Sequence, residues 1–169
     1  IDVLISDLED KPQKADPDDA VPDVTGPAIT RLGDIWQIGP HRLICGDSTK
    51  PETYAQLLDG ETAQMVFTDP PYNVRVDGHV SGLGKVKHRE FAMASGEMTE
   101  AEFAGFLKLV FANLVEVSVD GSINFVAMDW RHIAEVMTAG GGTYAAFKNL
   151  CVWSKMYKKS LMGERVPTC

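Results

Sequence analysis

The stretch VFTDPPYNV at residues 66–74 places a carboxylate, two prolines and a tyrosine at the end of an apolar run. Proline fixes φ and donates no backbone hydrogen bond, and it holds the preceding residue in an extended conformation. The turn is therefore stiff, and Asp69, the Pro70 carbonyl and the Tyr72 ring keep a fixed relation. Two adjacent acceptors suit an amino group, and an aromatic ring suits a flat heterocycle. The stretch predicts a pocket for an exocyclic amine. Alternatively, Asp69 caps the next segment and Tyr72 is a pocket wall.

A second acidic residue, Asp47, follows the apolar residues 43–45, one strand–helix unit upstream. The run at residues 63–68 is apolar rather than alternating, as expected of a central parallel strand covered on both faces. Ligands of parallel α/β sheets lie at the carboxyl ends of the strands, so we expect Asp47 and Asp69 to share one crevice. The alternative for Asp47 is a cap for the helix that begins near Pro51.

The alternation of strand and helix patterns predicts an α/β fold with a mostly parallel sheet and helices on both faces. The expected strands lie at residues 35–38, 43–45, 63–68, 122–127 and 149–153, and the expected helices near 51–58 (capped by Ser48 or Thr49), 99–117 and 131–138. In the second helix, Thr99 and Glu102 have capping-box spacing, and one broad apolar stripe follows. The stripe comprises Phe103, Phe106, Leu107, Val110, Phe111, Leu114 and Val115.

Residues 73–98 lack apolar periodicity, which predicts a long loop of the kind that is usually functional or disordered. Its basic residues are candidates for contact with DNA phosphates, although a solvated loop is the default interpretation. They are Arg75, Lys85, Lys87 and Arg89. Trp130, next to Asp129, is interpreted as a packing residue.

The composition limits the other possibilities. The 169 residues carry a net charge of −8, and the first 30 residues hold eight of the acids and two of the bases. The acidity therefore belongs mainly to residues 1–30, a Pro- and Asp-rich segment that is interpreted as a linker with the tail of an upstream domain. Three cysteines without a CxxC pair and four histidines without ligand spacing predict no disulfide framework and no metal. No membrane span or signal peptide is visible, which predicts a cytoplasmic protein.

Several motifs resemble those of the DNA methyltransferases that methylate amino groups and use S-adenosylmethionine. TDPPY at residues 68–72 resembles their catalytic motif, and LICGDS at 43–48 resembles the acidic strand-end motif one unit upstream. SINFVAM and LCVWSK resemble the next two strands. GDIWQIGPHRLICGDST is similar to the start of the methylase domain in proteins with a ParB-like nuclease domain upstream. The resemblance covers about residues 31–155.

The resemblance implies a partial Rossmann-like sheet of an S-adenosylmethionine-dependent methyltransferase. The substrate of such an enzyme would be double-stranded DNA. In such enzymes the target base is flipped out of the duplex. Asp69 and the Pro70 carbonyl would accept the amine hydrogens, Pro71 would complete the motif and Tyr72 would stack on the base. Asp47 would contact the cofactor adenosine, with Asp69 also on the cofactor side. Aspartate at the head of the motif favours adenine N6 over cytosine N4.

The family's glycine-rich cofactor motif is not found before DPPY. This implies the permuted order, in which the cofactor glycines come last, yet residues 156–169 lack the usual continuation. Two hypotheses follow. The chain is either part of an adenine-N6 methyltransferase that needs further residues or a partner, or a catalytically silent remnant that at most binds nucleic acid or protein weakly. An exposed sheet edge is also expected, through which the chain would self-associate.

Overall fold

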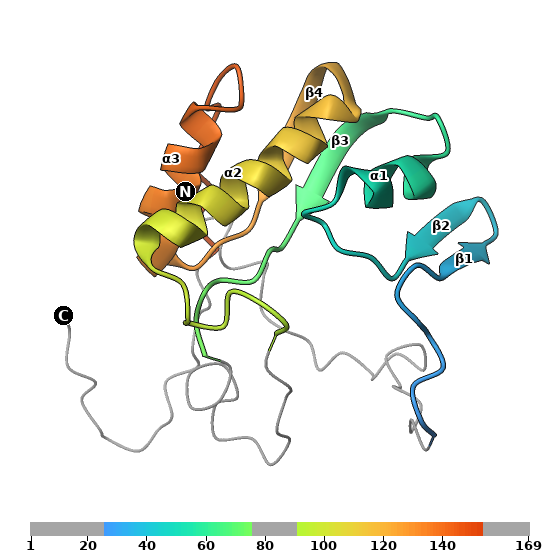
Figure 1. The fold of residues 1–169 in the computed structure, drawn as a ribbon. Helices are drawn as coiled ribbons and strands as arrows, with labels where there is room; N and C mark the ends of the chain where they lie inside the picture. Colours follow the sequence, from blue (N-terminus) through green and yellow to red (C-terminus); the bar gives the residue numbers. More distant parts are fainter. Residues whose placement is uncertain (1–25, 76–90, 154–169) are drawn as a thin grey trace, which may run out of the picture.

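The computed structural model describes residues 26–75 and 91–153 of the chain. Figure 1 shows a mixed α/β arrangement, as the sequence predicts. The elements, in chain order, are β1 (Ile35–Ile38), β2 (His41–Ile44), α1 (Pro51–Leu58), β3 (Ala63–Thr68), α2 (Glu100–Glu116), β4 (Ser118–Val126), the 3₁₀ turn η4 (Trp130–His132) and α3 (Ile133–Gly141). The described residues hold two sheets of two strands each rather than a Rossmann-like sheet. No helix in this part of the chain is long and apolar enough to cross a membrane.

β1 and β2 form an antiparallel hairpin in which Ile35–Ile38 pair with His41–Ile44. Gly39 turns the chain between them with a φ of +58°, a conformation that glycine adopts without steric cost. Arg42 joins the hairpin to the end of α1 through an ion pair of 3.2 Å with Asp59. The predicted strand pair is thus confirmed.

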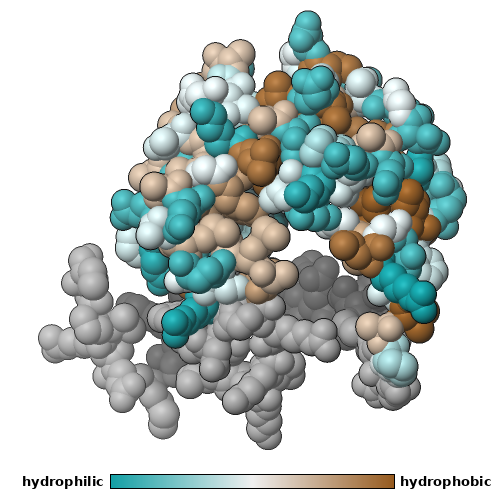
Figure 2. Space-filling view, viewed as in Figure 1, coloured by the Kyte–Doolittle hydropathy of each residue, from teal (hydrophilic) through white to brown (hydrophobic). Residues whose placement is uncertain are grey.

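Figure 2 shows hydrophobic residues at the surface on the side of the molecule where this hairpin lies.

β3 and β4 pair in parallel, with Met65–Thr68 opposite Ile123–Val126. The register shifts before this stretch, and Gly121 lies in the shifted part with a φ of +81°. The turn predicted at Asp120–Gly121 is therefore an irregularity within β4, which begins earlier, at Ser118.

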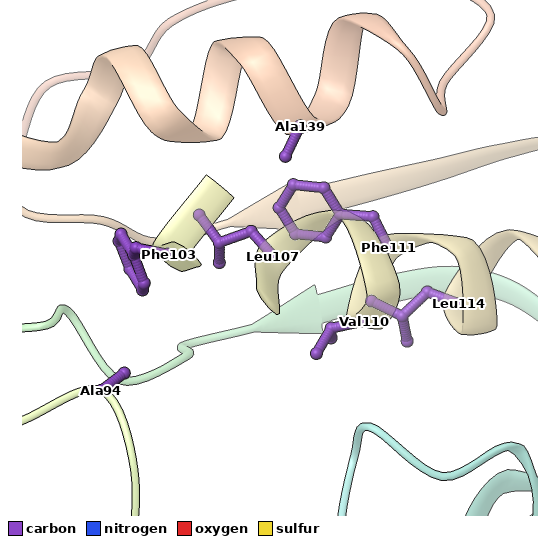
Figure 3. Packing of buried hydrophobic residues seen from close by; sticks show 7 residues of the cluster. All are labelled: Ala94, Phe103, Leu107, Val110, Phe111, Leu114 and Ala139. Carbon is purple, nitrogen blue, oxygen red and sulfur yellow. The ribbon is translucent and has the colours of Figure 1, made fainter. Parts of the chain in front are cut away.

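α2 supplies most of the core. The predicted capping box is confirmed, because Thr99 Oγ1 accepts from Glu102 N (3.3 Å) and Glu102 Oε2 accepts from Thr99 N (2.8 Å). The buried core cluster is made of Phe103, Leu107, Val110, Phe111, Leu114, Ala94 and Ala139. Figure 3 shows the α2 side chains of this cluster between α3 and β3. Of the predicted stripe, Phe106 is partly buried and Val115 is exposed, so the stripe is confirmed over its central turns.

The two faces of the β3–β4 sheet differ. Val66 and Val126 pack against the core cluster, whereas the side chains at the alternate positions are exposed. These outer-face residues are Met65, Phe67, Ile123 and Phe125. Phe67 is 75% exposed, and its ring centroid lies 6.3 Å from that of Phe125. The prediction of a strand covered on both faces is wrong for the described residues, because helices pack only on the side of Val66.

Three local predictions are corrected. Lys50, not Ser48 or Thr49, is the N-cap of α1, and it makes no side-chain capping bond. α3 continues through Gly141 instead of ending before the glycine run. Residues 149–153 are exposed and form no strand, because they join neither of the two described sheets.

Candidate active site at the carboxyl ends of β3 and β4

The DPPY turn follows directly from the end of β3. The end of the strand is held in place, because Ala127 N donates to Thr68 O at 2.9 Å, one step beyond β4. Asp69 is exposed, Pro70 is buried, and Tyr72 is partly buried. A buried Pro70 anchors the turn and leaves the carboxylate before it facing solvent. The carboxylate at the end of β3 is therefore open to solvent, next to a buried and conformationally fixed proline.

The Tyr72 hydroxyl donates a hydrogen bond to Asp69 Oδ1 across the two prolines. Burial, followed by this hydrogen bond and the negative charges of Asp69 and Asp129, raises the pKa of Tyr72 to about 12. The phenol therefore stays protonated at neutral pH and can act only as a donor toward the carboxylate. Neither prolyl residue has an N–H that could compete for Asp69.

Asp129 is a third acidic residue of the site that the sequence analysis did not assign. It follows β4 as Asp69 follows β3, and its charge acts on Tyr72. Its carboxylate accepts from Arg131 N (2.9 Å) and pairs with the Arg131 guanidinium (3.1 Å). The rule that sites form at the carboxyl ends of parallel strands would have identified it, because β4 was predicted.

Trp130 is 77% exposed, so its interpretation as a packing residue is wrong. The Arg131 guanidinium lies 5.5 Å from the centroid of the indole ring. The next residue, His132, fixes this segment to the core, because its Nδ1 lies 2.8 Å from Glu135 Oε1 and its ring forms a T-shaped pair with Phe103. An exposed aromatic ring and a cation therefore stand on a rigid support next to Asp129.

Asn73, directly after the motif, is a further residue that the sequence analysis missed. It is buried, with 8% of its surface exposed, and has a φ of +53°. Its side chain contacts the backbone of Gly96 and Met98. Asparagine is one of the few residues that tolerate positive φ, but the contact over more than 20 positions leaves no local signal.

Asp47 lies in a tight turn before α1. Its Oδ1 accepts from Thr49 N (2.9 Å) and from Thr49 Oγ1 (2.7 Å), and the second of these bonds is the main reason why the pKa of Asp47 is lowered. Its backbone carbonyl accepts from Thr53 Oγ1 at 2.8 Å. The geometry is that of a turn-stabilising aspartate, although Lys50 holds the cap position itself.

The expectation that Asp47 and Asp69 follow strands of one parallel sheet is wrong for the described residues. Asp47 follows β2, which belongs to the antiparallel hairpin, whereas Asp69 follows β3. The glycines at residues 140–142 lie at the end of α3 and not after a strand. The described residues thus provide the strand-end carboxylates but do not assemble a glycine-lined pocket for S-adenosylmethionine.

Of the predicted DNA contacts, only Arg75 lies within the described residues. It is exposed, and a Cβ atom on Gly96 would lie 3.2 Å from its Cγ. Lys85, Lys87 and Arg89 lie outside the described residues. In residues 26–75 and 91–153, no three His, Cys, Asp or Glu side chains are grouped so that they could hold a metal ion.

Comparison of the chain with protein-family models, with curated proteins and with solved structures finds no match. The DPPY motif and the geometry at the ends of β3 and β4 are therefore the features from which a function can be inferred.

Proposed function

We propose that the chain contains the amine-binding part of a DNA methyltransferase that acts on the N6 amino group of adenine, with S-adenosylmethionine as methyl donor. The observation that carries the proposal is the turn from Asp69 to Tyr72, with an exposed carboxylate, a buried proline and a phenol bonded to the carboxylate. Such an enzyme would act in the cytoplasm on double-stranded DNA.

The chemistry of the turn suits an amino group on a flat ring. The lone pair of such a nitrogen is delocalised into the ring, which makes it a poor nucleophile. Asp69 and the Pro70 carbonyl would accept its two hydrogens and localise the lone pair on nitrogen. A carboxylate offers about four acceptor positions, and Tyr72 uses one of them, so Asp69 retains room for the amine. Pro71 contributes stiffness and no competing donor.

The base would have to leave the duplex, at a cost of a few kcal/mol. Stacking on the Tyr72 ring would offset part of this cost, since base–aromatic stacking contributes roughly 1–3 kcal/mol per base. Trp130 and Arg131, at the neighbouring strand end, add an exposed aromatic ring and a cation. This combination is typical of surfaces that contact unpaired bases and phosphates.

S-adenosylmethionine would supply the methyl group when bound. Among the described residues, Asp47 is the candidate contact for its adenosine, and Asp69 is a second candidate contact for the cofactor. Because the described residues do not assemble a complete cofactor pocket, we expect full activity only with residues beyond those described or with a partner chain.

The first experiment is titration calorimetry of the whole chain with S-adenosylmethionine, followed by transfer of a labelled methyl group to duplex DNA. A matched duplex in which every adenine already carries an N6-methyl group serves as the control substrate. Label in the first duplex and not in the second would support the proposal. Equal label in both duplexes would contradict adenine N6 as the methylated group.

A second candidate is a catalytically silent binding module. The observation that favours it is the exposed outer face formed by Met65, Phe67, Ile123 and Phe125, because apolar surface gathered in one place commonly marks an interaction site. No binding of the cofactor at millimolar concentration would favour this candidate over methyl transfer.

A further inference from the structure

Asn73 makes the most extensive polar contacts of any residue adjoining the DPPY motif in the described part of the chain. Its Nδ2 donates to Met98 O at 2.8 Å, and its Oδ1 accepts from Gly96 N at 3.1 Å and from Met98 N at 3.2 Å. These bonds use both Oδ1 acceptor positions and one of the two donors of the amide. They join positions that are 23 to 25 residues apart in sequence.

The segment that receives Asn73 is itself fixed. The Glu97 carboxylate accepts from the backbone N–H groups of Ala94 and Ser95, each at 2.5 Å. Ala94 is fully buried and has a φ of +53°, and Gly96 has a φ of +92°. Met98 packs against the core cluster and precedes the capping residue of α2. Asn73 is therefore tied to an anchored backbone and not to a free loop.

The backbone of Asn73 is held in an unfavourable conformation. A positive φ is disfavoured for residues with a side chain, although asparagine tolerates it better than most, and here it accompanies three hydrogen bonds made by a buried side chain. Because residue 73 directly follows Tyr72, its backbone conformation sets the direction in which the chain continues after the DPPY turn.

We propose that Asn73 is a positioning residue, whose side-chain amide ties the DPPY turn to residues 94–98 and so holds the Tyr72 phenol on Asp69. The role of this contact rests on the proposed function, in which it keeps the amine-binding turn in place before a base arrives. We call the three hydrogen bonds of the Asn73 side chain the Asn73 clamp, and their geometry does not depend on methyl transfer.

The test compares the nitration of individual tyrosines by tetranitromethane at pH 8, mapped by mass spectrometry, in the whole chain. Nitration follows the phenolate fraction, which a pKa of about 12 lowers roughly 100-fold relative to an ordinary tyrosine. Asn73→Ala removes all three bonds. Asn73→Gly removes them as well but tolerates the positive φ. In both variants we expect Tyr72 to be nitrated at least tenfold faster.

Two comparisons keep the result specific. Asn113→Ala removes a side-chain amide that donates to Ser48 O at 3.2 Å, away from the turn, and should leave Tyr72 nitration unchanged. Tyr144, whose pKa is also about 12 because of burial, reports on the core in the same sample. An unchanged rate at Tyr72 in Asn73→Gly would overturn the proposal. So would an equal acceleration at Tyr144, which would mean that Asn73 only supports the fold.

The assay needs neither cofactor nor DNA, so it separates the clamp from the proposed function. Faster nitration of Tyr72 in a chain that never methylates DNA would retain the clamp and reject the methyltransferase. Methyl transfer to DNA together with an unchanged nitration rate at Tyr72 would retain the methyltransferase and reject the clamp.

Discussion

The Tyr72 hydroxyl is bonded to Asp69 Oδ1 across two consecutive prolines. In the proposed function, these are the two side chains that would bind the amine and stack on the base. An arriving amine would find the carboxylate already oriented, with one of its acceptor positions used by the phenol.

Asp69→Asn should reduce methyl transfer by about 10- to 150-fold, because hydrogen bonds to a charged acceptor contribute about 1.5–3 kcal/mol. The amide keeps the shape of the side chain but loses the charge and one acceptor oxygen. Incorporation of labelled methyl groups into DNA would be measured under saturating cofactor. Asp120→Asn, an exposed carboxylate within β4, is the matched control. Equal activity of the two variants would remove Asp69 from the site.

Alkaline pH should destabilise the fold in the range between about 10 and 12. The pKa values of Tyr72 and Tyr144 are both raised to about 12, chiefly by burial. A group whose pKa is raised on folding contributes its stability fully below the unfolded pKa, near 10, and loses it as the pH rises through the folded pKa. Denaturant unfolding at pH 9, 10, 11 and 12 would follow the loss. Tyr72→Phe and Tyr144→Phe should each flatten the decline.

Leu107→Ala should destabilise the fold by about 2–5 kcal/mol, the usual cost of removing a buried leucine. Leu107 is fully buried in the α2 core cluster, while Leu109 in the same helix is 49% exposed. Leu109→Ala should therefore cost only about 0.5 kcal/mol. Guanidinium unfolding of the two variants measures the difference. Similar values would show that α2 does not face the core as described.

Trp130→Ala should weaken binding of DNA that carries an unpaired adenine by about 5- to 150-fold, which corresponds to the loss of roughly 1–3 kcal/mol of stacking. Trp36→Ala, a half-exposed tryptophan in the β1–β2 hairpin, should leave the affinity unchanged. Fluorescence anisotropy at fixed salt would compare them. A larger effect from Trp36 would move the DNA-binding surface to the hairpin.

Phe67→Ser should reduce self-association of the chain, because it removes the most exposed aromatic ring of the outer face. Light scattering over a range of concentrations would measure the average mass. Phe91→Ser removes an exposed phenylalanine from another part of the chain and should have little effect. A wild-type chain that stays monomeric at high concentration would argue against association through β3 and β4.

The parts of the fold that were predicted correctly depend on short stretches of sequence. The capping pair Thr99 and Glu102 and the stripe after it specify α2 within a few turns, and the DPPY turn follows from the fixed φ of Pro70. The strand predicted at residues 149–153 is wrong because strand formation depends on pairing with a distant segment. The apolar residues of a short stretch do not indicate whether such a partner strand is present.

The candidate site was predicted in part for the same reason. Asp69 and Tyr72 lie within four residues, so their relation was predictable from proline geometry. Asn73 and Met98 are 25 positions apart, and their contact depends on how the chain returns to α2. Asp129 comes near Tyr72 only because β4 pairs with β3 in parallel.

The turn at Gly46 and Asp47 has a consequence for how relatives of this chain would be compared. A Cβ atom on residue 46 would lie 2.4 Å from Thr53 Cγ2, so a larger residue there would displace the Thr53 side chain, whose hydroxyl is bonded to Asp47 O. Asp47 bonds to Thr49 in a way that few other side chains reproduce. Evolution would therefore preserve a Gly-Asp pair at this position for the sake of the turn alone. Conservation of this pair among related chains would reflect the backbone structure of the turn. It would not show whether a related chain is catalytically active.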